Sequence, residues 1–122
     1  MPFLHAAQQA VADPATPREI RLTLEYLLAN AVGRNNAHPM DDVLGHLFAN
    51  GIQIGPSKFQ TTILAESREG QIFIGAGQRG YFLIETEEDA RATLRFYESR
   101  IASELRRIAN LRALSAIEGW NL

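Results

Sequence analysis

The sequence predicts an α+β fold in which helices are arranged around a single β-hairpin. Residues 71–84 contain two runs of β-branched, aromatic and other large apolar residues, joined by a segment with three glycines. The segments before and after this stretch carry helix-capping residues and apolar positions spaced by three or four. With 122 residues, of which 46% are hydrophobic, the chain is long enough for one domain with one core.

The composition excludes several classes of protein. There is no cysteine, so the chain has neither disulfide bonds nor a thiolate zinc site, and a reducing cytoplasm is the expected location. The apolar runs are too short to span a bilayer and the first residues lack the pattern of a secretory signal, so we expect no membrane partner. The net charge of -2 gives no general attraction to nucleic acid, so a DNA-binding protein of this composition has to gather its arginines on one face.

The first strong helix signal lies at residues 16–19. Thr16 is a capping residue, Pro17 suits the first helical position and Glu19 completes a capping box. The apolar positions that follow form one stripe: Ile20, Leu24, Leu27, Leu28 and Ala31. Residues 1–15 have no strong start or stop signal, so we expect either an N-terminal arm or a short helix that packs on a partner.

Two further helices are predicted before the hairpin. His38-Pro39 begins one of them, with two aspartates in the first turn, and Asn50-Gly51 ends it. The spacing of Ser57 and Gln60 is that of a capping box, which predicts a third helix from Ser57 to about Arg68. A strand over residues 59–64 is the competing interpretation because Thr-Thr-Ile favours β-structure.

A long helix is predicted after the hairpin. Thr86 is followed by three acidic residues, and neither proline nor glycine interrupts the chain before Gly119. A helix of about 30 residues is roughly 45 Å long, which exceeds what a core of this size can cover. We therefore expect a homodimer through its apolar stripe, which comprises Leu94, Tyr97, Ile101, Leu105 and Ile108.

No motif in the chain predicts a catalytic site, a cofactor or a metal ion. Gly75, Gly77 and Gly80 have the spacing of a dinucleotide-binding fingerprint, but Gly80 leads into a strand instead of a helix, so they are expected at a hairpin tip. His38, Asp42 and His46 have a spacing compatible with metal ligands, although the first two are better explained by a helix start. No nucleophile elbow or paired-acid motif is present, and we expect no enzyme.

The order helix, helix, short turn, helix, hairpin is that of a winged helix-turn-helix. In that fold the third helix enters the DNA major groove and the hairpin, or wing, touches phosphates or the minor groove. The chain then divides into an N-terminal arm (1–15), a winged helix-turn-helix domain (16–86) and a C-terminal dimerisation helix (87–118). The expected contacts to double-stranded DNA are Lys58, Thr61, Thr62, Arg68, Gln78 and Arg79.

From Gly75 through Leu111 the sequence resembles a family of small winged-helix proteins common in phages and prophages. The matching residues are Gly80-Tyr81-Phe82, Glu87-Glu88-Asp89, Arg100-Ile101 and Leu111. The resemblance implies a DNA-binding or regulatory protein. Together with the homodimer expected from the long helix, it makes a dimeric transcriptional regulator of phage or bacterial origin the expected function. The alternative is an adaptor or inhibitor that binds a protein partner without DNA, which the acidic charge balance and the single lysine favour.

Overall fold

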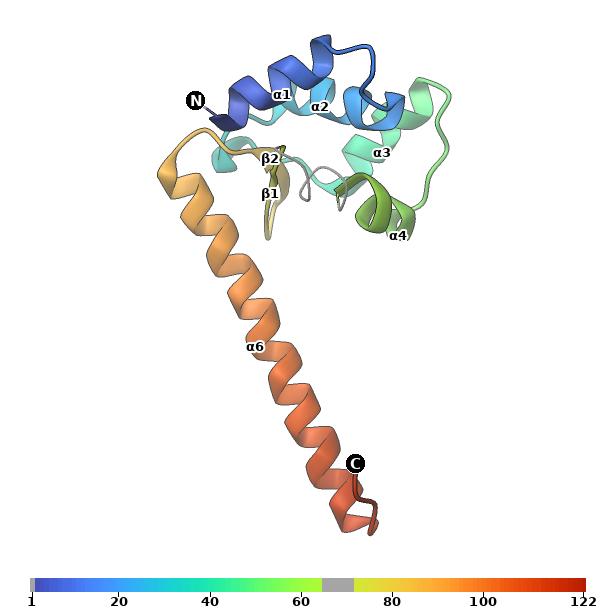
Figure 1. Ribbon diagram of the computed structural model, residues 1–122, viewed down its shortest axis with the longest axis vertical. Helices are drawn as coiled ribbons and strands as arrows, with labels where there is room; N and C mark the ends of the chain where they lie inside the picture. Colours follow the sequence, from blue (N-terminus) through green and yellow to red (C-terminus); the bar gives the residue numbers. More distant parts are fainter. Residues whose placement is uncertain (1, 65–71) are drawn as a thin grey trace.

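The computed structural model describes residues 2–64 and 72–122, which form an α+β fold (Figure 1). The predicted combination of helices, one antiparallel hairpin and a long C-terminal helix is confirmed. The elements are α1 (Pro2–Ala12), α2 (Arg18–Asn30), the 3-10 turn η1 (Arg34–Asn36), α3 (Met40–Ala49), α4 (Pro56–Lys58), the π-helical η2 (Phe59–Leu64), β1 (Ile74–Gly77), β2 (Gly80–Leu83) and α6 (Glu87–Ile117).

The N-terminal residues form a helix that packs on its own chain. α1 lies against α2, with Ala7 fully buried and Ala10 nearly so. These small side chains allow the two helices to approach closely, and both alanines belong to the main hydrophobic cluster. Residues 2–12 are therefore part of the folded body.

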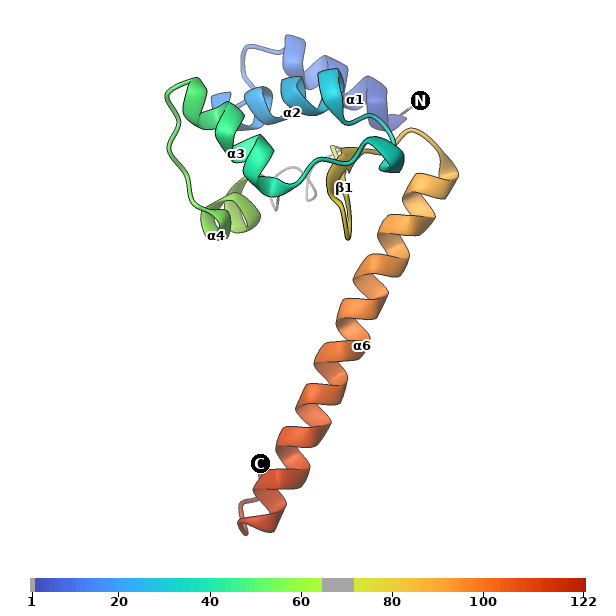
Figure 2. The ribbon, with the colours of Figure 1, turned by 180° about the vertical axis from the view of Figure 1, so that it is seen from behind.

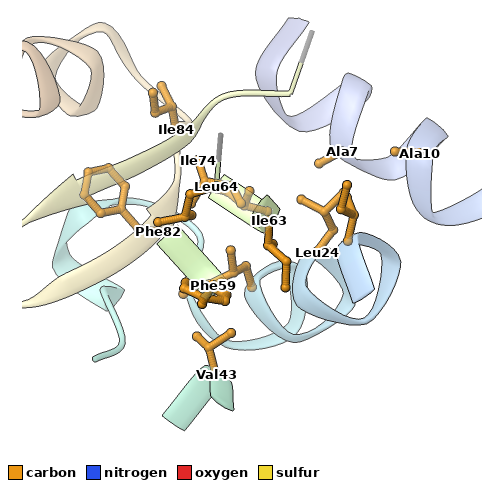
Figure 3. Packing of buried hydrophobic residues seen from close by; sticks show 14 of the residues in the cluster. Ala7, Ala10, Leu24, Val43, Phe59, Ile63, Leu64, Ile74, Phe82 and Ile84 are labelled. Carbon is orange, nitrogen blue, oxygen red and sulfur yellow. The ribbon is translucent and has the colours of Figure 1, made fainter. Parts of the chain in front are cut away.

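The core lies between α2, α3, η2 and the hairpin (Figure 3). The α2 stripe predicted by the apolar spacing is buried at Ile20, Leu24 and Leu27. Phe59 is completely buried, and its ring contacts the ring of Tyr81 at the edge of the hairpin. Burying a side chain of this size contributes about 2 to 3 kcal/mol, so η2 anchors the hairpin to the helices.

The segment that contains α4 and η2 is helical over all its described residues. It begins at Pro56 with Gly55 as the N-cap, one residue before the predicted start at Ser57. The competing strand over residues 59–64 is wrong, because this stretch makes a π-helical turn that buries three apolar side chains. The predicted end at Arg68 falls outside the described residues.

The hairpin is joined to the linker between α2 and α3. β1 and β2 pair in register from Ile74 opposite Leu83 to Gly77 opposite Gly80. The amide of Leu83 donates to the carbonyl of Ala31, and His38 exchanges two backbone hydrogen bonds of 2.8 and 3.0 Å with Tyr81. β2 is thus hydrogen-bonded on both sides, which fixes the hairpin relative to the helices.

Two glycines in the hairpin are required by close contacts. Gly80 has a φ of 122°, and a Cβ atom there would lie 2.0 Å from the carbonyl oxygen of His38. A Cβ atom on Gly75 would lie 2.6 Å from the ring of Phe82. The glycine spacing that resembles a nucleotide fingerprint therefore serves hairpin packing.

One buried carboxylate attaches the start of α6 to the body. Asp89 and the N-cap Thr86 form a reciprocal capping box with bonds of 3.2 Å. Asp89 also accepts hydrogen bonds from the amides of Glu85 at 3.0 Å and Arg34 at 3.1 Å. Burial alone would raise the pKa of Asp89, but these hydrogen bonds outweigh it and hold the pKa below the ordinary value.

Beyond its first turns, α6 runs away from the helices and the hairpin (Figures 1 and 2). Its 31 residues expose several large apolar side chains, among them Ile101 and Leu105, each 60% exposed. In the described part of the chain, no helix has both the length and the apolar content needed to cross a bilayer.

We predict that Gly80→Ala strongly destabilises the protein, whereas Gly45→Ala does not. The new methyl group of the first variant meets His38 at a strained backbone angle, so the free energy of unfolding should fall by about 2 kcal/mol or more. Gly45 lies in the interior of α3 with open space around it, and alanine there should add about 0.5 to 1 kcal/mol. Urea unfolding, monitored by circular dichroism, measures the free energy of unfolding of each variant. Equal changes in the two variants would contradict the close contact between Gly80 and His38.

We predict that Asp89→Asn lowers the free energy of unfolding by about 2 to 3 kcal/mol at pH 7, because charge-assisted hydrogen bonds are lost. The stabilisation from the Asp89 carboxylate is complete above its unfolded pKa of about 3.9 and is lost as the pH falls through the lower folded value. The difference in stability from wild type should therefore shrink as the pH falls below about 4. Glu88→Gln, an exposed neighbour, is the control, and the same loss in both variants would refute the role of Asp89.

Candidate nucleic-acid interface

The hairpin tip presents two of the predicted DNA contacts. Gln78 and Arg79 form the two-residue turn between β1 and β2, and both side chains are exposed. The tip points in the same general direction as α6 (Figure 1). Because Arg79 is exposed at this turn, a phosphate or a groove edge can reach its guanidinium.

The segment formed by α4 and η2 corresponds to the predicted third helix, and we keep the name third helix for it. It presents two more of the predicted DNA contacts. Lys58 and Thr61 are exposed, and the Thr61 hydroxyl donates a hydrogen bond of 3.0 Å to the carbonyl of Ser57. The side chain of Thr62 and the whole of Arg68 lie outside the described residues. Among the described residues of this helix, Lys58 is therefore the cation that a ligand can reach.

A hollow of about 530 Å³ connects the third helix with the hairpin tip. Gln60 lines it from η2, Gln78 and Arg79 line it from the hairpin, and Arg100 lines it from α6. The sequence analysis assigned Gln60 to a capping box with Ser57, but the helix begins at Pro56 and the side chain of Gln60 is exposed. Gln60 is thus a polar candidate contact that the sequence analysis missed.

A larger groove of about 830 Å³ lies between the hairpin and the first half of α6; we call it the arginine groove. The cations that line it come from η1, the hairpin tip and α6: Arg34, Arg79, Arg95, Arg100 and Arg107. Of these five arginines, Arg79 was predicted as a DNA contact, whereas the arginines of α6 were not among the predicted contacts. The missed signal is that the positions of Phe96, Arg100, Ser103 and Arg107 recur by three or four, which places them on one face of the helix.

The arginine groove carries an excess of positive charge. Glu104 is the one carboxylate among its lining residues, and it pairs with Arg107 at 2.5 Å. Within the described residues, the other four guanidinium groups have no carboxylate at ion-pair distance. The guanidinium of Arg100 lies 5.7 Å from the centre of the Phe96 ring, so the aromatic face is partly covered by a cation.

The opposite face of α6 carries the predicted dimer contacts. Its side chains are between 46% and 60% exposed, and we call them the apolar stripe: Leu94, Ile101, Leu105 and Ile108. Tyr97, the fifth predicted contact, is half-buried on the body side, where its ring contacts Phe73 and Phe96. α6 thus has two separate surfaces, one basic and one apolar.

A polar cluster joins α2, α3 and the linker before α3. The hydroxyl of Tyr26 lies 2.8 Å from Nδ1 of His38, which is 3.3 Å from the carboxylate of Asp42. The rings of Tyr26 and His46 are 5.2 Å apart. Burial and then the Asp42 carboxylate raise the pKa of Tyr26, and no group of three or more metal-ligating side chains occurs in the described ranges. The cluster is well explained as a contact that fixes the linker.

The chain matches no protein-family model, no curated protein sequence and no solved structure at a significant level. Inference about its function therefore depends on its own surfaces: the hairpin tip, the third helix, the arginine groove and the apolar stripe. Three of these carry hydrogen-bond donors or positive charge, and the fourth is apolar.

Proposed function

We propose that the protein is a dimeric winged helix-turn-helix protein that binds double-stranded DNA and regulates transcription. The observation that carries the proposal is an arginine-bearing hairpin whose second strand is hydrogen-bonded to the linker between α2 and α3 and whose Tyr81 ring contacts Phe59 of the third helix. This arrangement holds the helix and the hairpin tip in fixed relative positions. A rigid pair of contact elements is what recognition of a duplex requires.

The exposed side chains of these elements suit contact with DNA. Lys58 supplies a cation on the third helix, and Gln60 and Gln78 supply amide groups that can both donate and accept hydrogen bonds. Arg79 at the hairpin tip can donate to phosphates or enter the minor groove. The gathering of arginines beside the hairpin also meets the requirement that the net charge of -2 imposes on a DNA-binding protein.

The apolar stripe supports a dimer. Leu94, Ile101, Leu105 and Ile108 are separated by seven, four and three residues, which is the spacing of a seam between paired helices. All four are large and exposed, and a second copy of α6 would remove them from water. A two-fold dimer would read a pseudo-palindromic site with half-sites one or two helical turns apart.

The adaptor or inhibitor function is the second candidate, and one further observation favours it. The end of the chain exposes more large apolar side chains than one helix seam uses: Leu111, Leu114, Ile117, Trp120 and Leu122. A protein partner is a natural cover for them. Failure of the purified protein to bind random duplex at about 50 mM salt would favour this candidate and contradict DNA binding.

We predict that Lys58→Ala combined with Arg79→Ala weakens binding to random duplex DNA, because two phosphate contacts are lost. The salt slope, which is the slope of the logarithm of the binding constant against the logarithm of the salt concentration, should decrease in magnitude by about 2. Fluorescence anisotropy between about 50 and 200 mM salt measures both quantities. The control, Arg91→Ala with Arg106→Ala, removes the same charge from exposed positions that line neither hollow. Equal binding by the test variant and wild type would remove the hairpin tip and the third helix from the interface.

We predict that Ile101→Asp combined with Leu105→Asp converts the dimer into a folded monomer. Both side chains are exposed in the single chain, so the substitutions remove the seam without burying charge in the core. Light scattering gives the mass, and circular dichroism reports folding. Asn110→Asp, an exposed position outside the stripe, should leave the dimer intact. A monomeric wild type, or a test variant with dimer mass, would refute the proposed seam.

A further inference from the structure

We infer that the arginine groove holds the phosphate backbone of one strand of the bound DNA duplex, so that α6 is a DNA-contact element as well as the dimer element. The inference rests on the proposed function, because it takes DNA as the partner. It adds a contact surface that neither the third helix nor the hairpin tip provides.

The shape of the groove fits one strand's backbone. α6 forms one wall, and the hairpin with η1 forms the other. Small side chains keep the space open: Ala76, Gly77, Ala92, Ser99 and Ser103. The α6 face from Ala92 to Arg107 covers 16 residues. Its length of about 22 Å matches the axial length of roughly six phosphates of one strand. A groove of about 830 Å³ has room for part of the sugar-phosphate backbone of one strand, while the bases and the second strand stay outside it.

The charge of the groove indicates an anionic occupant. Arg34, Arg79 and Arg95 come from three different elements, and the fold brings them to one hollow in which, among the described residues, no carboxylate lies within ion-pair distance of any of the three. Like charges that line one hollow create a positive potential that attracts an anionic ligand. Guanidinium groups donate to phosphate oxygens in a bidentate manner, and the hydroxyls of Ser99 and Ser103 can add hydrogen bonds.

Two observations favour a phosphate backbone over a peptide. The large apolar side chains of the groove are Phe82, which is buried, and Phe96, which lies under Arg100, so little apolar surface is available to a helix or a strand of a partner. Arg79 also belongs to both the groove and the hairpin tip, so a strand that touches the tip continues into the groove without interruption.

The first test replaces two exposed groove arginines, Arg95→Ala with Arg100→Ala, and measures binding to random duplex by anisotropy over a range of salt. We expect affinity at about 100 mM salt to fall roughly tenfold or more and the salt slope to decrease by about 2. The control Arg91→Ala with Arg106→Ala carries the same charge change on the same helix and should change affinity less than about twofold. Neither control arginine lines the groove, but Arg106 donates a hydrogen bond to the groove-lining Ser103 and Arg91 pairs with Glu87. The single variants Arg95→Ala and Arg91→Ala, compared in the same way, remove the influence of Arg106.

The second test uses the absence of natural cysteines to place a single thiol. Ser103→Cys lines the groove, whereas Ala102→Cys, the adjacent residue, does not. Duplex DNA should slow alkylation of the first thiol at least several-fold and leave the second unchanged. Each variant is its own reference, because the rate is compared with and without DNA.

The outcomes separate the two proposals. If Arg95→Ala with Arg100→Ala behaves like its control while Lys58→Ala with Arg79→Ala weakens binding, the groove inference is wrong and the proposed function stands. If wild type does not bind duplex at about 50 mM salt, both fail. Protection of the Ser103→Cys thiol by polyglutamate or by single-stranded DNA, but not by duplex, would also overturn the inference in favour of an acidic protein or an unpaired strand.

Discussion

One buried carboxylate attaches the start of α6 to η1, and both the arginine groove and the apolar stripe lie on the helix that it attaches. Asp89 binds the amide of Arg34 in η1 and the amides of Glu85 and Thr86 at the start of α6. These bonds tie together the two elements that form the walls of the arginine groove. Beyond this attachment α6 extends away from the body, and its apolar stripe is exposed to solvent.

The second constraint is the backbone pairing of β2 with the linker between α2 and α3. A two-stranded hairpin by itself is marginally stable in water, but here Tyr81 and Leu83 also bond to the linker. Gly80 has no side chain, which permits this approach to the backbone of His38. The arginine at the hairpin tip is therefore carried by a fixed support, as a contact residue must be if DNA is to be read in one register.

Local signals in the sequence predicted the elements well. The acidic turn after Thr86 predicted the start of α6, and the absence of proline and glycine predicted its length to within a few residues. The α2 stripe and the hairpin followed from apolar spacing and glycine placement. Errors at boundaries were small, but the predicted capping box of Thr16 and Glu19 is wrong: α2 begins at Arg18, its N-cap is Pro17, and no side chain caps it.

The arrangement of the surfaces could not be predicted from the same signals. The burial of Ala7 against α2, the pairing of His38 with Tyr81 and the meeting of Arg34 with α6 are contacts between distant parts of the chain, and alanine or arginine spacing alone does not encode them. Periodicity showed that α6 has an apolar stripe. It did not show that Tyr97 turns toward Phe73 while Arg100 faces the hairpin, because that depends on how Asp89 anchors the helix.

The most direct test of the account is the NMR signal of each arginine side chain in a titration with a short random DNA duplex. The account predicts that the Nε–Hε signals of Arg79, Arg95 and Arg100 shift on binding and lose their shifts as salt is raised, while that of Arg91 stays in place. No shift in any arginine signal at about 50 mM salt would contradict DNA binding. Equal shifts at Arg91 and Arg100 would contradict a defined contact face.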